Sequence, residues 1–270
     1  MNNNHKSEGD DHELFEPEID DALDGLLTAA HRRLDPALRR IRRPRAEIDV
    51  IESAFGPLMV AQSERGLLAV RFMDVKDGDK IPDGLREHFE LVENHTFGAQ
   101  IADELDHLMH GDAAAVAARP VDLSLVAGEF QRRALVRLRR IPAGAVVTYQ
   151  GLAGMAGSPS AQRAVGNTVA SNPVAIYVPC HRVIKSDLTI GNYGGGVERK
   201  LKLLRAEGFA ADRARRIPPE AVYGHLGTRI FCRPTCSAAK RANRDRMLIF
   251  PAPRGAAAAG MRPCKLCHPA

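Results

Sequence analysis

The 270-residue sequence lacks the features that would place it in or across a membrane. No apolar run approaches the ~18 residues that a membrane-spanning helix requires. The N-terminus, MNNNHKSEGDD, has no basic stretch followed by an apolar one and so does not resemble a secretory signal. There is no internal repeat, and the hydrophobic fraction of 44% is ordinary for a globular protein. We expect a cytoplasmic chain of about two domains, without a membrane partner, that folds around its own core.

Cysteine is scarce and its count is odd. Five cysteines cannot all pair within one chain. A cytoplasmic location also keeps thiols reduced. We therefore expect reactive thiols or metal ligands in place of disulfides.

The net charge is +5, but the charges are unevenly distributed along the chain. The first 24 residues hold nine acids and one base, a charge of −8. Residues 220–270 hold nine bases and two acids, a charge of +7. A basic body with an acidic tail is common among nucleic-acid-binding proteins. A solvated basic surface is the alternative interpretation.

Patterning divides the chain into five stretches. Residues 1–45 form an acidic and then basic tail. Residues 46–125 form an N-terminal α/β subdomain, with strand-like runs over 47–55, 57–61 and 66–73 and then a helix-like run around Ile101 and Leu105. Residues 126–210 contain an amphipathic helix over 129–140, a helix-turn-helix outline within 148–173 and a final helix ending at Gly208. Residues 211–219 form a linker, and residues 220–270 form a small Cys-rich basic module.

Cys180 is followed directly by His181. A thiolate is the nucleophilic form of cysteine, and a nearby base lowers the cost of forming it. Adjacent side chains of an extended backbone point to opposite sides, so a relay through water is easier than a direct bond. Taken alone, a buried cysteine beside a satisfied histidine is the simpler interpretation.

The surroundings of this pair favour chemistry. PCHRVI, with EFQ, IPAGAVVTYQGLA, RAVGN, SNP and GNYGGG…RKLKLLRAEG, resembles the O6-alkylguanine-DNA alkyltransferase family, also called methylated-DNA–protein-cysteine methyltransferases. The resemblance is specific from Gly128 to Gly208 and looser from Ile48 to Ser124. It implies an α/β plus α fold, with an RNase H-like subdomain before a helical, winged helix-turn-helix-like domain. It also implies that an alkyl group moves from guanine O6, or from thymine O4, in double-stranded DNA to a cysteine.

The resemblance assigns the thiol relay to four residues. Cys180 is the acceptor, His181 is the base acting through water, Glu207 orients His181, and Asn172 braces the active-site turn. The thioether product is a poor leaving group, and no residue offers a way to regenerate the thiol. We therefore expect a single-turnover reagent.

The resemblance also assigns contacts with DNA. The target base lies inside the stacked duplex and must be flipped out. Arg163 fills the gap and Tyr149 assists extrusion, while the guanine pocket is lined by Val183, Tyr193 and Gly194. One departure concerns Leu188, which stands where the family usually has glycine, so the loop beside the pocket can differ in shape.

The other four cysteines form two close pairs, Cys232-x-x-x-Cys236 and Cys264-x-x-Cys267. Such spacings predict a tetrahedral Cys₄ site for one Zn²⁺, with no organic cofactor. Because the module has few large apolar residues, we expect metal to supply stability that its core cannot. Cys264 to His268 also matches a haem-attachment pattern, but haem leaves the first pair unexplained.

This module resembles the zinc domain of the bacterial Ada protein. The resemblance implies that Cys232 is both a zinc ligand and a methyl acceptor from methylphosphotriesters; zinc used only for folding is the alternative. In Ada the domain order is reversed, and we expect no regulator segment here because the sequence ends three residues after Cys267. Two further hypotheses stay open for the whole chain, which we expect to be monomeric: a non-enzymatic sensor of alkylated DNA and a Cys–His hydrolase.

Overall fold

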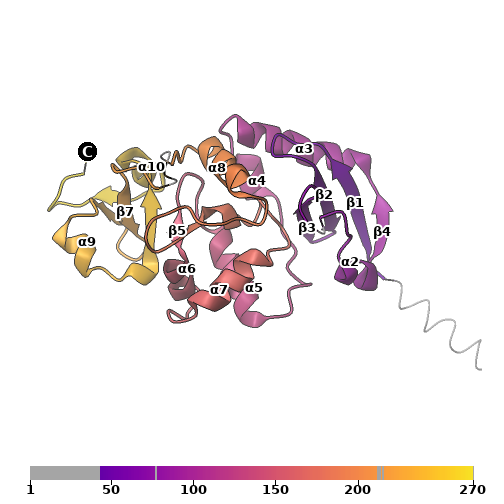
Figure 1. The fold of residues 1–270 in the computed structure, drawn as a ribbon, viewed down its shortest axis with the longest axis horizontal. Helices are drawn as coiled ribbons and strands as arrows, with labels where there is room; N and C mark the ends of the chain where they lie inside the picture. The colour runs from indigo at the N-terminus through magenta and orange to yellow at the C-terminus, as the bar shows by residue number, and fades with distance from the viewer. Residues whose placement is uncertain (1–42, 77, 212–213, 215, 270) are drawn as a thin grey trace, which may run out of the picture. The chain divides into compact units, whose positions relative to one another are not determined.

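The computed structural model describes residues 43–76, 78–211, 214 and 216–269 (Figure 1). The chain divides into two units, Met1–Pro44 and Arg45–Ala270. The predicted tail therefore lies outside the described residues except at its end, where Arg45 already begins a strand. None of the helices in these ranges combines the length and apolar character needed to cross a membrane.

The first part of the second unit is a four-stranded sheet in the order β3-β2-β1-β4. Its strands are β1 (Arg45–Ile51), β2 (Leu58–Ser63), β3 (Gly66–Phe72) and β4 (Glu90–Glu93). The first three are antiparallel neighbours, whereas β4 runs parallel to β1. The three predicted strands are confirmed with shifted ends. β4 was not predicted, because its ELVE sequence is short and largely exposed.

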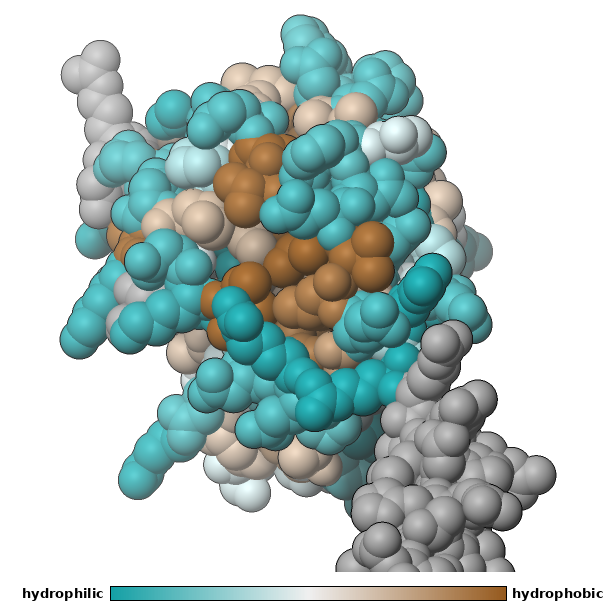
Figure 2. Space-filling view, turned by 90° about the vertical axis from the view of Figure 1, so that its right-hand side faces the viewer, coloured by the Kyte–Doolittle hydropathy of each residue, from teal (hydrophilic) through white to brown (hydrophobic). Residues whose placement is uncertain are grey.

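Helices cover the two faces of this sheet unequally. The longer one, α3 (His95–Met109), confirms the predicted helix and buries Phe97, Ile101, Leu105 and Leu108 in the main core (Figure 1). The other face holds a second apolar cluster partly covered by α2 (Asp83–His88), and α4 (Ala114–Ala118) follows α3. Figure 2 looks at this end of the molecule and shows an apolar area ringed by hydrophilic side chains.

The region after Gly128 is mainly helical. It consists of α5 (Glu129–Arg139), β5 (Val147–Thr148), α6 (Tyr149–Met155), α7 (Gln162–Ala170), the 3₁₀ turn η1 (Cys180–Arg182), β6 (Val183–Ile184) and α8 (Val197–Ala206). The predicted amphipathic helix and the two helices after it are present. Thr148 caps α6, since its hydroxyl oxygen accepts a hydrogen bond from the Gly151 N–H at 3.0 Å. β5 and β6 pair in parallel, which places Val183 beside Val147.

The Cys-rich module contains a second four-stranded sheet, in the order β10-β8-β7-β9. Its elements are β7 (Val222–His225), β8 (Ile230–Cys232), α9 (Ser237–Arg241), η2 (Arg244–Arg246), β9 (Met247–Phe250), α10 (Pro253–Ala258) and β10 (Arg262–Pro263). The apolar residues of this module do not form a separate core. Phe231, Leu248, Phe250 and Met261 are buried in the same apolar cluster as Val147, Val183 and Leu203 of the preceding region.

The predicted linker is held at one end. Arg216 forms a β-bridge with Thr189, and the Ile217 N–H donates to the Leu188 carbonyl at 3.3 Å. Ile217 also packs against a buried cluster that includes Ile184 and Ile249. The described part of this segment is therefore structured and ties the Cys-rich module to the loop after β6.

Candidate active site and metal centre

The segment before Cys180 is attached to the edge of the N-terminal sheet. The Val70 N–H in β3 donates to the Pro173 carbonyl at 2.9 Å, and the Ala175 N–H donates to the Val70 carbonyl at 3.0 Å. Further along, the Tyr177 hydroxyl donates to Glu104 of α3 at 2.8 Å. These contacts fix a buried backbone run immediately before the thiol, which gives the N-terminal sheet a role in positioning the site.

Cys180 opens the 3₁₀ turn and is 5% exposed. The Asn172 side-chain amide donates to Cys180 Sγ at 3.1 Å and to the Val178 carbonyl at 2.8 Å. Burial raises the pKa of the Cys180 thiol, while the Asn172 hydrogen bond and the charge of Lys200 act in the opposite direction. The thiol is thus mainly protonated at rest and needs a base to become a nucleophile.

A buried histidine–carboxylate pair lies beside the thiol. His181 Nε2 is 2.8 Å from Glu207 Oε1, and these side chains are 0% and 1% exposed. Burial lowers the pKa of His181, although Glu207 opposes the shift, so the ring is neutral at pH 7. With its proton on Nε2, the ring keeps a lone pair on Nδ1, a buried atom without a hydrogen-bond partner in the described residues.

The Glu207 carboxylate is held as an anion. Burial alone would raise its pKa, but the charges and hydrogen bonds of His181 and Arg182 lower it to about 2. Arg182 donates from Nε to Glu207 Oε2 at 2.8 Å and from a terminal nitrogen to Oε1 at 2.6 Å. Arg182 also donates to the Ile141 carbonyl. The sequence analysis did not assign a role to Arg182, although it adjoins the Cys-His pair.

Lys200 is a second functional residue that the sequence analysis did not identify. This side chain is fully buried in α8, and its ammonium donates to the Val183 carbonyl at 2.6 Å. Burial lowers the pKa of Lys200 to about 8, and the negative charge of a Cys180 thiolate raises it. A lysine on the apolar stripe of α8, three and four residues before Leu203 and Leu204, was the available signal.

Two tyrosines lie near the thiol. Burial, followed by the charge of Cys180, raises the pKa of both Tyr149 and Tyr193. The Tyr193 ring packs edge-on against His181 with centroids 6.5 Å apart, and its buried hydroxyl has no partner in the described residues. Gly194 follows on the exposed side of this loop. Tyr149 and Tyr193 therefore lie close enough to Cys180 for its charge to affect them, and Val183 packs in the same apolar cluster as Cys180.

Arg163 is not part of this gathering. It lies near the start of α7 with its side chain exposed. The structure also corrects the reasoning for a water relay: residues 180–182 form a 3₁₀ turn, so the extended-backbone argument was wrong. No direct Cys180–His181 hydrogen bond is present within the described site all the same. Leu188 has φ +67°, the left-handed conformation that favours glycine.

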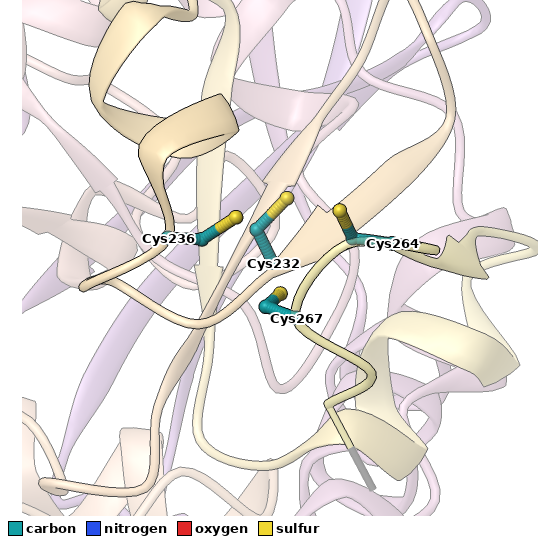
Figure 3. A group of neighbouring side chains, drawn as sticks. All are labelled: Cys232, Cys236, Cys264 and Cys267. Atoms are coloured by element: carbon teal, nitrogen blue, oxygen red, sulfur yellow. The ribbon is translucent and has the colours of Figure 1, made fainter.

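The four remaining cysteines form one cluster (Figure 3). Their Sγ atoms all lie within 4.8 Å of one another, close to the ~3.8 Å spacing of a tetrahedron with Zn–S bonds of about 2.3 Å. Cys232 ends β8 and Cys236 precedes α9, whereas Cys264 follows β10. The donor set fits Zn²⁺, and the convergence of both pairs disfavours the haem interpretation. The four cysteines form one zinc site.

Backbone N–H groups distinguish the four sulfurs. The Arg233 N–H donates to Cys267 Sγ and the Leu266 N–H donates to Cys264 Sγ, both at 3.4 Å. Backbone hydrogen bonds from Leu266 and Cys267 lower the pKa of Cys264 to about 7. In the described residues, Cys232 and Cys236 receive no such backbone bond.

Comparison with known proteins places the chain in a family. Residues 129–209 match the family described as 6-O-methylguanine DNA methyltransferase, DNA binding domain. A methylated-DNA–protein-cysteine methyltransferase of Methanosarcina acetivorans is 36% identical over 159 residues, which cover 59% of this chain and 96% of that protein. The chain belongs to this methyltransferase family. A crystal structure of Mycobacterium tuberculosis OGT in complex with DNA is 32% identical, with a TM-score of 0.49 over 60% of this chain and 93% of that one.

The Cys-rich module has its own match. Residues 209–270 match the metal binding domain of Ada. Ada itself also matches this chain: the Escherichia coli bifunctional transcriptional activator/DNA repair enzyme Ada is 36% identical over 162 residues, 58% of this chain, so most of the aligned residues lie outside the Cys-rich module. Those residues cover only 44% of Ada. This methyltransferase therefore combines a mixed α/β alkyltransferase fold with an Ada-type zinc domain.

Proposed function

We propose that this protein repairs alkylated DNA by moving one alkyl group from guanine O6, or from thymine O4, to Cys180. The observation that carries the proposal is the buried Cys180 thiol beside a neutral His181 whose Nδ1 is unpartnered. In a family that transfers methyl groups to cysteine, this arrangement supplies both nucleophile and base. Because the product is a stable thioether, each molecule reacts once. We expect the protein to act as a monomer.

The transfer is an in-line displacement. A water molecule passes the Cys180 proton to His181 Nδ1, and Glu207 stabilises the imidazolium that forms. The sulfur forms a bond to the alkyl carbon while the bond from that carbon to O6 breaks, and its electrons leave with the guanine. The Tyr149 hydroxyl donates a hydrogen bond to the departing base. Asn172 and Lys200 stabilise the thiolate in the meantime, through a hydrogen bond and a positive charge.

Flipping brings the base to this site. Extruding a nucleotide costs a few kcal/mol, and Arg163 recovers part of that cost by occupying the gap in the duplex. Its exposed position on α7 supports this role, since the residue has to reach into DNA. Val183, Tyr193 and Gly194 line the pocket for the flipped guanine.

Cys232 is the second acceptor, for methylphosphotriesters. Bound zinc keeps its sulfur ligands deprotonated at neutral pH. Cys264 and Cys267 each accept a hydrogen bond from a backbone N–H, which weakens them as nucleophiles, whereas Cys232 and Cys236 do not. Between these two, the resemblance to Ada favours Cys232, the first cysteine of the four. The Cys232 sulfur forms a bond to the methyl carbon as the carbon–oxygen bond breaks, and the phosphodiester anion leaves.

The proposal includes a domain organisation for the chain and a location in the cell. It comprises an RNase H-like subdomain over 46–125, a winged helix-turn-helix-like alkyltransferase domain over 126–210, a linker over 211–219 and a zinc domain over 220–270. The two helices α6 and α7 and the convergence of the cysteines support these assignments. The five unpaired cysteines favour the cytoplasm, where thiols stay reduced.

The test is mass mapping of the protein after incubation with duplexes bearing labelled O6-methylguanine or a labelled methylphosphotriester. We expect one label on Cys180 from the first duplex and one on Cys232 from the second. C180S and C232S are the matched controls, each of which should lose one label and keep the other. Label on Cys180 alone makes zinc purely structural. No label with intact DNA binding supports a sensor, and multiple turnover on an acyl substrate supports a hydrolase.

A further inference from the structure

The zinc domain and the alkyltransferase domain share backbone hydrogen bonds. The Val146 N–H donates to the Ile249 carbonyl at 2.9 Å, and the Ile249 N–H donates back to Val146 at 2.8 Å. These two hydrogen bonds join β9 to the residue before β5. The zinc-domain sheet therefore adjoins β5, which pairs with β6, the strand that contains Val183. Glycine at 154 allows η2 to approach α6, because a Cβ there would lie 2.1 Å from Asp245 Cβ.

A cavity of about 270 Å³ lies at this junction. Thr148, Gln150 and Ser186 line it from the alkyltransferase domain, while Lys240 and Arg244 line it from the zinc domain. The lining includes both cations and no carboxylate. Neither cation has an ion pair within the described ranges. The nearby Asp187 accepts hydrogen bonds from the Thr189 N–H and hydroxyl within its own turn.

This lining suits a small anion with several acceptor oxygens. Two cations supply charge, and the hydroxyls of Thr148, Ser186 and Tyr223 and the Gln150 amide supply neutral donors. The Thr148 oxygen already accepts from Gly151, which leaves its proton free to donate. The volume is below that of most small-molecule pockets, so it fits a phosphate group better than a whole nucleotide.

We propose that this cavity binds a backbone phosphate of the DNA duplex whose damaged base enters the Cys180 site. The inference rests on the proposed function, because it takes DNA as the substrate. Thr148 and Gln150 flank Tyr149, the residue assigned to the flipped base, and Ser186 follows β6 of the guanine pocket. A duplex engaged at Cys180 therefore passes the cavity. There, Lys240 and Arg244 allow the zinc domain to bind the same duplex as the alkyltransferase domain.

The test measures the affinity of the full-length, zinc-loaded protein for an undamaged duplex at several salt concentrations. Each lost phosphate contact lowers the slope of log K against log salt by about 0.9. We expect K240A/R244A to lower the slope by about one such step, because one phosphate occupies the cavity, and K240Q/R244Q, which keeps polar side chains without the charge, to do the same. R205A/R254A removes two exposed cations that do not line the cavity and serves as the charge control.

A second readout separates this inference from the proposed function. Transfer of the benzyl group from the free base O6-benzylguanine to Cys180 needs no phosphate contact. Its rate should therefore be equal in the unmodified protein, the two cavity variants and the charge control. Equal salt slopes for the cavity variants and the control overturn the inference. Tighter binding of deoxynucleotide monophosphate than of duplex to the cavity also overturns it. No transfer from free base or damaged DNA in the unmodified protein overturns the proposed function instead.

Discussion

Replacing Glu207 by glutamine probes the buried ion network directly. Glu207 has a pKa of about 2 in the folded protein and 4.5 as its ordinary value. The difference corresponds to about 3 kcal/mol of stability at neutral pH, at about 1.4 kcal/mol per pKa unit. The folded pKa is the lower one, so this stability is complete above pH 4.5 and is lost as pH falls toward 2. About 1.4 kcal/mol should be lost between pH 6 and pH 3.5 from this group alone.

The assay is urea unfolding at pH 6 and pH 3.5. E207Q removes the titrating group but keeps an oxygen that accepts from His181 Nε2, so the imidazole tautomer is preserved. We expect the variant to be less stable than the original protein at pH 6, with a difference that narrows at pH 3.5. The exposed Glu64, in the turn between β2 and β3, provides the control, E64Q, whose profile should follow the original.

Glu207 also supports the basicity of His181, because its charge opposes the lowering of the histidine pKa by burial. E207Q should therefore slow transfer from free O6-benzylguanine by up to about 100-fold, the lower end of the ~10²–10⁴-fold that general-base catalysis contributes. Parallel stability profiles for E207Q and the original protein between pH 6 and 3.5, together with an unchanged transfer rate, would refute the reasoning.

Three further predictions concern other parts of the molecule. N172A removes the hydrogen bond to Cys180 and should raise the pKa of that thiol, shifting the pH profile of alkylation upward; an unshifted profile contradicts this role. G154A forces a methyl group toward Asp245 and should lower the unfolding free energy by about 1–3 kcal/mol, whereas G166A, with open space around it, should not. Removing zinc with a chelator should lower the melting temperature and expose four more thiols to a thiol reagent, and added Zn²⁺ should reverse both; an unchanged melting temperature contradicts a folding role for the metal.

The Cys-rich module shows where local composition misleads. Few large apolar residues predicted a core too small to fold without metal. The structure places Phe231, Leu248 and Phe250 in one cluster with residues of the alkyltransferase domain. The module thus buries apolar surface against its neighbour, a contribution that depends on tertiary contact and has no periodicity in the sequence.

Leu188 stands where the family usually has glycine, and the fold explains part of this difference. Its backbone has φ +67°, which costs a branched residue about 1 kcal/mol relative to glycine. Its side chain packs on the cluster that includes Ile184, Ile249 and Ile217, and its carbonyl accepts from the Ile217 N–H. The apolar contact with the segment leading to the zinc domain offsets the backbone cost.

The sequence by itself determined the chemistry of this protein. Residue type and short spacing predict the roles of Cys180-His181 and of the two cysteine pairs, because nucleophiles and metal ligands need particular atoms. The tertiary structure decided how those atoms are tuned. Val70 fixes the active-site segment from over 100 residues away, and Lys200 and Arg182 become functional only when burial removes them from water. Burial and long-range contact set pKa values and geometry, and neither is encoded in neighbouring residues.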